Sequence, residues 1–299
     1  MKMNHSPRLR SWKIVRNVWI YTFLLPCVIV FLFFYLIPIV TVLVTSFTQW
    51  GGWQSPTFIG FDNYIRLWNA PSFMVSLRNL FWWSVIAIVI HVGFGVLVAF
   101  VLHRRPFGWK FTRAVFMIPN VISMAAWSLI FRFAFDIRMG FINDIIQVFN
   151  PDFNVNWLAT HPYAFWVVTF TWLFFSVVVM LIVQGDLKAI GTEIHEAARI
   201  DGANVWHMVT RIDLPLCRNA IGTGIILSLT SRIAMFESIV LLTNGGPGST
   251  TMNIPILMVR RILDHEYGYA NAMATVMIII GVATLLIVNK LFRMSESYY

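Results

Sequence analysis

The sequence predicts an all-α integral membrane protein with six transmembrane helices and both termini in the cytoplasm. Three observations lead to this prediction. The 299 residues are 58% hydrophobic and only 12% charged, whereas soluble domains are about 25% charged. Long runs of the chain carry no charge at all, and lysine and arginine gather in alternate loops.

The uncharged runs are long enough to place the helices. Crossing a bilayer takes about 20 helical residues, and lipid leaves the backbone no partner outside its own helix. Asp, Glu, Lys and Arg are absent from 17–61, 79–103, 114–131, 153–185 and 267–289, and a sixth run is interrupted only by Arg232 and Glu237. We therefore predict helices near 20–46, 80–102, 114–135, 164–184, 219–243 and 270–291.

Loop charges predict the orientation, because cytoplasmic loops hold the excess of lysine and arginine. Five such residues precede the first helix, four lie in 103–113, four in 185–218 and two near the C-terminus, while the opposite loops together hold five. The expected organisation is a basic cytoplasmic segment (1–19), one membrane domain (20–291) with a cytoplasmic loop (185–218), and a cytoplasmic tail (292–299).

The net charge of +9 is accounted for by this topology and by contact with anionic headgroups, so nucleic acid is not an expected partner. The apolar run after Arg16 exceeds the 7 to 15 residues of a signal peptide, and the first helix is expected to remain in the membrane. Cys27 and Cys217 lie too far apart across the bilayer to form a disulfide.

Catalytic motifs are not found. The sequence has no G-x-x-x-x-G-K-[ST], H-E-x-x-H or G-x-S-x-G pattern, so we expect no catalytic residues, no metal site and no cofactor bound by this chain. The stretch TNGGPGSTT (243–251) has glycines but no lysine and lies on the external side. It is predicted to be a tight turn that ends the fifth helix rather than a phosphate-binding loop.

The cytoplasmic loop holds the most informative stretch. Thr192–Ile200 (TEIHEAARI) begins with a cap and early acids and predicts a short helix. Gly202 permits a positive φ and a sharp turn, and a second short helix is expected over 203–211 before Pro215. The resulting elbow is either a docking element for a partner or an amphipathic segment that rests on the membrane surface.

The same stretch resembles a known family. Glu196-Ala197-Ala198, three residues, Gly202, nine residues, then Ile212, Asp213, Leu214 and Pro215 match the EAA loop of permeases in bacterial ABC importers. EAARIDGA, LTNGGP, IPIVTVLVTSF, FIGFDNYIRLW and YGYANAMATV are similar to sugar permeases of the maltose and glycerol-phosphate type. The resemblance runs from about residue 20 to 290.

This resemblance implies a type I importer fold. It also implies a second permease as partner, most often a paralogue, two ATP-binding subunits that use ATP and Mg, and an extracytoplasmic solute-binding protein. Extra N-terminal helices and the large external insertion of some maltose-type members are not predicted here, which favours the compact members. The resemblance implies that the coupling residues are Glu196, Ala197, Ala198, Asp201, Gly202, Ile212, Leu214 and Pro215.

Arg232 is the most informative residue within a span. A charge there is costly and usually faces a bundle interior or a watery cavity, so it lines the substrate pathway, pairs with Glu237 or snorkels. Contact with substrate would favour an anionic sugar, such as a uronate oligomer or a sugar or glycerol phosphate. The residues predicted to line the pathway are Ser228, Arg232 and Phe236, which share a face at i, i+4 spacing, together with Glu237, Trp172 and Ser176.

An ion-coupled secondary sugar transporter is the alternative function. It would require acidic ion sites within the membrane, and only Glu237 qualifies. His91 and His207 have no visible ligand partners and are expected to serve packing or hydrogen bonding. The EAA loop discriminates between the two, because a secondary transporter has no need of it.

Overall fold

The computed structural model describes residues 7–173 and 176–294, most of which are helical. Parts of the predicted N-terminal segment and C-terminal tail, at 1–6 and 295–299, lie outside the described residues. Within the described ranges, four helices are long and apolar enough to cross a membrane, and two bent pairs raise the number to six if each pair is one span. The predicted all-α membrane architecture is confirmed.

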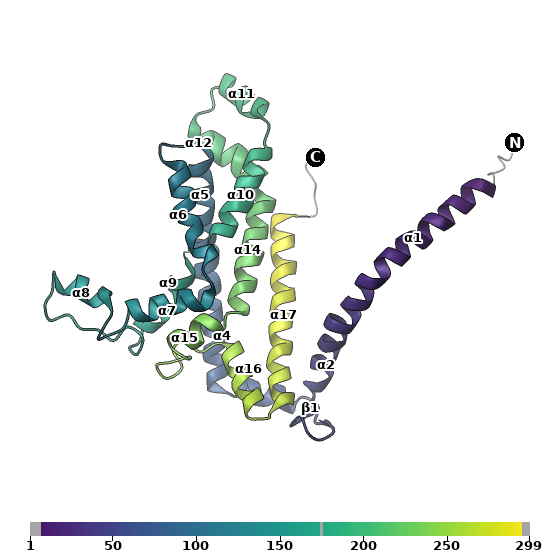
Figure 1. Ribbon diagram of the computed structural model, residues 1–299, viewed down its shortest axis with the longest axis vertical. Helices are drawn as coiled ribbons and strands as arrows, with labels where there is room; N and C mark the ends of the chain where they lie inside the picture. Colours follow the sequence, from purple (N-terminus) through teal and green to yellow (C-terminus); the bar gives the residue numbers. More distant parts are fainter. Residues whose placement is uncertain (1–6, 174–175, 295–299) are drawn as a thin grey trace.

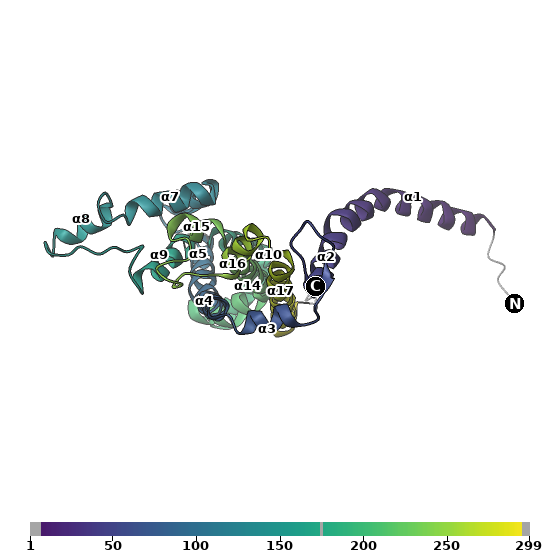
Figure 2. The same cartoon turned by 90° about the horizontal axis from the view of Figure 1, so that it is seen from below.

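The first span stands apart from the rest of the molecule. It consists of α1 (Pro7–Phe31), a π-helical turn η1 (Leu32–Leu36) and α2 (Ile37–Thr45). In Figures 1 and 2, α1 leads away from the helical body while the lower end of α2 stays against it. None of the most apolar window of Val18–Thr45 is buried within the chain. A helix that is apolar all round needs lipid or another protein to cover it.

A compact external segment follows the first span. Strand β1 (Thr48–Gln49) pairs antiparallel with β2 (Thr57–Phe58), and helix α3 (Asp62–Trp68) comes next. The buried Asn63 side chain donates hydrogen bonds to the carbonyl oxygens of Ser46 and Thr48, each at 2.9 Å. These bonds attach α3 to the end of the first span.

The second span is one long run of α4 (Pro71–Ile86), η2 (Ala87–Val92) and α5 (Gly93–His103). It begins at Pro71 rather than near residue 80, because a proline at the first position is compatible with a helix start. The η2 segment is a π-helical turn, a widening often found at functional sites. It lies against α14.

The predicted third helix, 114–135, is wrong as a single element. The chain forms α6 (Trp109–Val121) and α7 (Met124–Ala134), which meet at 100°. Ile122 and Ser123 adopt extended backbone angles, and the Ser123 hydroxyl accepts a hydrogen bond from the Ala126 amide at 3.2 Å. This N-cap starts a new helix where apolar periodicity alone predicts continuation.

An extended external segment follows α7. It contains α8 (Phe141–Gln147), which projects from the body on the side opposite α1 (Figure 2). The fourth span is then formed by α9 (Tyr163–Leu173) and α10 (Val177–Ala189). Its described residues agree with the predicted helix near 164–184.

Close backbone approach brings α5, α10 and the next long helix, α14 (Arg218–Ile233), together. A Cβ atom added to Gly95 would lie 2.9 Å from the Val179 Cβ, and one added to Gly224 would lie 3.0 Å from the Val179 Cγ1. Small residues at helix interfaces allow such contacts in membranes. Val179 is therefore held between two glycine-bearing helices.

The cytoplasmic elbow joins α10 to α14. It begins with α11 (Thr192–Ile200), and a single helical arm follows the turn, made of α12 (Val205–Met208), the π-helical turn η3 (Val209–Asp213) and α13 (Leu214–Leu216). The second arm runs to residue 216 rather than ending near 211 as predicted, because Pro215 occupies the first turn of α13, where its missing N–H is tolerated. The arm and α14 meet at an angle of 65°.

The predicted fifth helix, 219–243, is also broken. It ends at Ile233, and α15 (Glu237–Leu242) begins after three non-helical residues. The buried Asn253 side chain donates a hydrogen bond to the Met235 carbonyl within this break. A distant asparagine thus satisfies a backbone group that a continuous helix would have satisfied itself.

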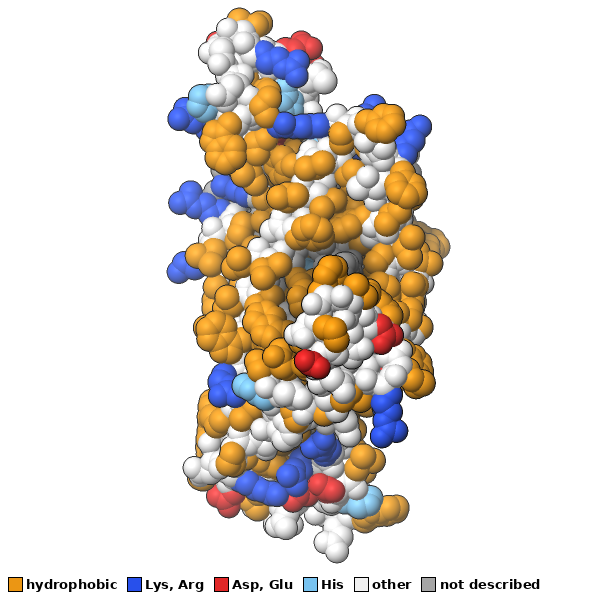
Figure 3. Space-filling view, turned by 90° about the vertical axis from the view of Figure 1, so that its left-hand side faces the viewer, with side chains coloured by type: hydrophobic (Ala, Val, Ile, Leu, Met, Phe, Trp, Pro, Cys, Tyr) orange, Lys and Arg blue, Asp and Glu red, His pale blue; other side chains and the backbone are white. Residues whose placement is uncertain are grey.

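The chain ends with α16 (Ile254–Leu263) and α17 (Tyr267–Phe292), and α17 packs against α14, α16 and α2. The first turns of α1 and the last turns of α17 lie toward the end that carries α11, while β1 and α16 lie at the opposite end (Figure 1). This arrangement agrees with the predicted orientation. Figure 3 shows hydrophobic side chains over much of the face, a projecting polar group with acidic side chains near its middle, and basic side chains at both ends and along one edge.

Candidate functional site

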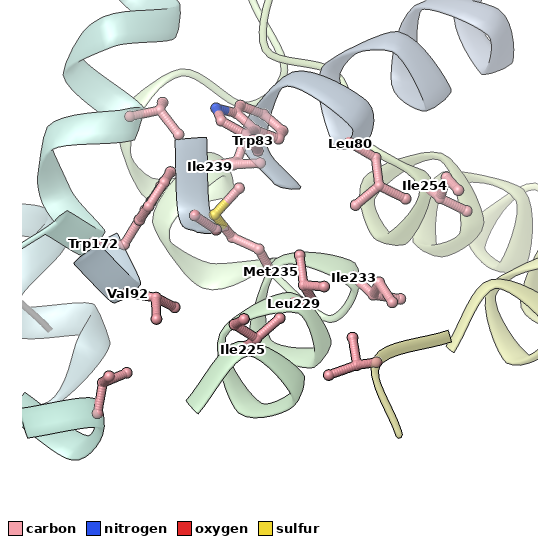
Figure 4. Packing of buried hydrophobic residues seen from close by; sticks show 14 of the residues in the cluster. Leu80, Trp83, Val92, Trp172, Ile225, Leu229, Ile233, Met235, Ile239 and Ile254 are labelled. Carbon is pink, nitrogen blue, oxygen red and sulfur yellow. The ribbon is translucent and has the colours of Figure 1, made fainter. Parts of the chain in front are cut away.

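A cavity of about 620 Å³ is lined by residues of η2, α9, α10, α14 and α15, together with one residue each from α6 and α7. This volume is within the range of ligand pockets in proteins. Trp172 and Met235 of this cavity also belong to the buried hydrophobic packing drawn in Figure 4, together with Val92 and Ile239. The polar residues that line the cavity are His91, Asn120, Ser228, Ser231, Arg232, Glu237 and Ser238.

Arg232 supplies the buried charge of this cavity. Its residue surface is only 5% exposed, and its guanidinium carbon lies 4.2 Å from the centroid of the Trp172 ring. One terminal nitrogen has a weak contact with the Met235 sulfur at 4.0 Å, and Nε has no hydrogen-bond partner among the described residues. Guanidinium groups stack well on aromatic faces, so Trp172 positions the charge without neutralising it.

Neither alternative for Arg232 is seen in the described part of the chain. Its nearest acidic residue in sequence, Glu237, is exposed, lies on a different helix and makes no ion pair with it. Snorkelling would carry the guanidinium to the water interface, whereas here it is buried over an indole.

His91 enters the site from the π-helical turn η2. Its ring meets Trp172 edge-on, with centroids 5.8 Å apart and planes at 63°. His91 Nδ1 and Trp172 Nε1 have no hydrogen-bond partner among the described residues, although both are buried. Sequence reasoning assigned His91 to packing. The available signal was a polar side chain within an uncharged span, which marks a cavity more often than a lipid face.

The cavity gathers five of the six residues predicted for the pathway: Trp172, Ser228, Arg232, Phe236 and Glu237. Phe236 does so by a different route than predicted. It precedes the first turn of α15, so it shares no helical face with Ser228 and Arg232 on α14. Ser176 is buried at the start of α10 but is not among the lining residues.

The cytoplasmic elbow presents the second candidate site. Gly202 has φ +80°, and its left-handed turn separates α11 from α12 as expected. Glu196, Ala197, Asp201 and Gly202 are exposed. Ile200 is 87% exposed and Trp206 is 71% exposed, one on each side of the turn. Large apolar side chains presented on a charged, protruding element are typical of a protein-binding surface.

An internal contact joins the two arms of the elbow. His195 Nε2 on α11 lies 2.8 Å from Asp213 Oδ1 in η3. Ile212 and Leu214, beside Asp213, are half-buried, while Pro215 is exposed. Sequence reasoning did not single out His195, because only the turn at Gly202 brings it back to Asp213.

A bent helical domain with a polar cavity inside and a protruding cytoplasmic elbow defines a membrane-embedded transport subunit. Residues 91–297 match the family described as "Binding-protein-dependent transport system inner membrane component", and the chain belongs to this family. It is therefore a multi-pass inner membrane component of a transport system that works with a binding protein.

The chain is also similar to individual permeases, and its fold is similar to that of a solved structure. The chain is 33% identical over 280 residues to "Probable ABC transporter permease protein YurN" of Bacillus subtilis, covering 91% of this chain and 95% of the relative. It is 28% identical to "Multiple sugar-binding transport system permease protein MsmF" of Streptococcus mutans, covering 92% and 95%. Its fold is similar to a chain of a bacterial ABC transporter involved in the import of the acidic polysaccharide alginate, with a TM-score of 0.80, 22% identity and coverage of 96% and 100%.

Proposed function

We propose that this chain is the non-catalytic permease subunit of an ATP-driven importer for an oligosaccharide or sugar derivative. The observation that carries the proposal is the pairing of an internal polar cavity with an exposed cytoplasmic elbow on one continuous piece of chain. The elbow's second arm leads directly into α14, which bears Ser228 and Arg232 of the cavity. Movement of the elbow therefore acts on the cavity wall without an intervening flexible linker.

In this proposal the elbow docks on an ATP-binding subunit. Exposed Ile200 and Trp206 supply apolar anchors, and tryptophan is enriched among residues that dominate binding energy. Exposed Glu196, Ala197, Asp201 and Gly202 and half-buried Ala198 belong to the same docking element, and Ile212, Leu214 and Pro215 connect it to the membrane domain. ATP and Mg are used by the partner subunits and not by this chain.

A second permease, a paralogue of this chain, completes the pathway. The part of the first span formed by α1 stands away from the body (Figure 1), and the most apolar window of Val18–Thr45, none of which is buried within the chain, offers an apolar surface for another membrane protein. In this proposal each of the two permeases supplies half of the path. A solute-binding protein delivers cargo at the end that carries β1 and α16.

Support for a sugar as cargo comes from the relatives and from the cavity. Relatives include permeases described for multiple sugars and for starch degradation products. The cavity combines the Trp172 indole with serine hydroxyls and a guanidinium, a combination suited to the apolar ring faces and hydroxyl groups of carbohydrates.

The test uses the chain co-expressed with its second permease and ATPase subunits and reconstituted in liposomes with the binding protein. Gly202→Asp places a charged side chain in a left-handed turn with no atoms within 4 Å. We expect it to release the ATPase subunit or to abolish substrate-stimulated ATP hydrolysis.

Gly108→Asp is the matched control, because Gly108 is also exposed and cytoplasmic, has φ +78° and has open space around its Cβ position. Equal behaviour of the two variants would contradict the docking role of the elbow. Transport that persists without ATP would instead favour an ion-coupled secondary transporter.

A further inference from the structure

We propose that the cavity around Arg232 recognises a carboxylate group of the transported sugar, so that the cargo is a uronate-containing oligosaccharide. This inference rests on the proposed function and specifies its substrate class. The observation behind it is a buried guanidinium that is oriented by an aromatic ring and lacks a carboxylate partner among the described residues.

Arg232 carries a buried positive charge. A guanidinium stays protonated in proteins, and removing such a charge from water is costly unless a counter-ion compensates it. At 5% exposure Arg232 is nearly removed from solvent, yet its partners are an indole face and a thioether. An anion entering the cavity would provide the missing compensation.

The cavity wall also contains buried polar atoms that lack hydrogen-bond partners among the described residues. Buried polar atoms in native structures nearly always have partners. Here Trp172 Nε1, Ser228 Oγ and Arg232 Nε lie in one cavity wall without any partner among the described residues. The indole and guanidinium nitrogens can only donate, and the hydroxyl can donate. A set dominated by donors fits a ligand rich in acceptors, and a carboxylate accepts up to four hydrogen bonds.

Glu237 is an acidic residue that lines the same cavity. Glu237 is exposed, whereas Arg232 is buried. Solvent screens an exposed charge far more effectively than a buried one, so the positive charge dominates the inner part of the cavity. Glu237 lies where it can accept hydrogen bonds from sugar hydroxyls, which every pyranose presents.

Trp172 and His91 lie beside Arg232, where the sugar ring that carries the carboxylate would be bound. Trp172 is 1% exposed, and one of its faces is occupied by the guanidinium. His91, whose ring centroid lies 5.8 Å from that of the indole, also lines the cavity, and its Nδ1 has no hydrogen-bond partner among the described residues. A pyranose carboxylate that approaches Arg232 would therefore meet a polar imidazole nitrogen beside it, which can serve the ring hydroxyls.

The experiment measures the preference of the cavity itself. The importer, assembled with its second permease and ATPase subunits but without binding protein, is placed in nanodiscs and titrated calorimetrically. The probes are trigalacturonate and its fully methyl-esterified form, which have the same backbone and differ in charge. We expect wild type to bind the acid at least about tenfold more tightly than the ester, the effect of one charge-assisted hydrogen-bonded contact.

Variants assign that preference to Arg232. Arg232→Gln is expected to bring the two affinities within about twofold of each other, and Arg232→Lys to keep part of the preference because it retains the charge but not the planar fork. Arg138→Gln, an exposed external position with the same change in net charge, is expected to behave as wild type. The comparison of the acid and the ester on the wild-type importer tests the proposal by itself. Its result does not depend on whether a variant folds.

The outcomes separate this inference from the proposed function. Equal binding of acid and ester by wild type, or a preference that survives Arg232→Gln, would overturn carboxylate recognition. If the wild type binds both probes equally and Ser228→Val weakens its affinity for both, the cavity remains the sugar pathway but does not discriminate by charge. If neither probe binds at millimolar concentration, both the proposed carboxylate recognition and the assignment of this cavity to the sugar pathway are wrong.

Discussion

His195 Nε2 lies 2.8 Å from Asp213 Oδ1, and this contact joins the first arm of the cytoplasmic elbow to the second. Asp213 is 8% exposed and sits in the π-helical turn that leads toward α14. Between the two residues the chain reverses at Gly202. The contact therefore links the two arms of the elbow to each other. Linked arms move together, as they must if the elbow is to transmit movement to α14.

Loss of this contact should impair coupling more than docking. His195→Ala or Asp213→Ala removes a partly buried polar contact while leaving Ile200 and Trp206 in place. We expect the ATPase subunit to co-purify normally and substrate-stimulated ATP hydrolysis to fall about fivefold or more, in line with a contact worth about 1 kcal/mol or more. His207→Ala is the control, because its exposed residue contributes only a backbone amide bond. Unchanged stimulation in both arm variants would show that the elbow transmits movement without the contact.

Docking itself should depend on the exposed tryptophan of the elbow. Trp206→Ala removes a 71% exposed indole and should weaken ATPase binding by about 2 kcal/mol, as for an interface hot spot. The measurement is the affinity of the reconstituted permease pair for purified ATPase by surface plasmon resonance. Phe107→Ala, at a fully exposed position in another cytoplasmic loop, should change it little. Equal losses from both variants would indicate a broader docking surface.

Helix packing should tolerate extra volume at Gly93 but not at Gly95. An alanine Cβ at Gly95 would lie 2.9 Å from both the Ser176 carbonyl oxygen and the Val179 Cβ, whereas at Gly93 nothing lies within 4 Å. We expect Gly95→Ala to destabilise the protein by about 1–3 kcal/mol through overpacking, and Gly93→Ala to leave it unchanged or slightly more stable. Thermal unfolding in detergent compares the two values of Tm. Similar Tm values would show that α10 can move away from α5.

The external loop should depend on Asn79. This buried side chain donates to the carbonyl oxygens of Thr250 and Met252, each at 2.9 Å, and so attaches the glycine-rich turn to α4. Asn79→Ala would leave both carbonyls without this donor, a cost of about 1–3 kcal/mol. Hydrogen exchange of 243–253 should rise, while Asn69→Ala, at an exposed asparagine, should leave it unchanged. Faster exchange confined to α4 would contradict this attachment.

Several features could be predicted from the sequence because they depend on local physics. Uncharged runs of sufficient length locate the membrane spans, and loop charges orient them. The elbow was predictable as well: Thr192 through Ile200 form the expected helix, and Gly202 has the expected positive φ. The expected cap at Thr192 is wrong, because Gly191 occupies the N-cap position without a side-chain hydrogen bond and Thr192 is the first helical residue. Helix propensity and the steric freedom of glycine act within a few residues of chain.

Only the tertiary structure decided where the spans break and which side chains meet. The sequence predicts continuous helices through Ser123 and Met235, yet a serine cap interrupts one, and Asn253 from another segment holds the break in the other. That second break moves Phe236 and Glu237 off the helix of Arg232. The meeting of His91, Trp172 and Arg232 depends on three helices at once. The sequence by itself determined the topology, because partition into lipid is set residue by residue. The structure decided the cavity, because packing among distant segments determines where polar groups converge.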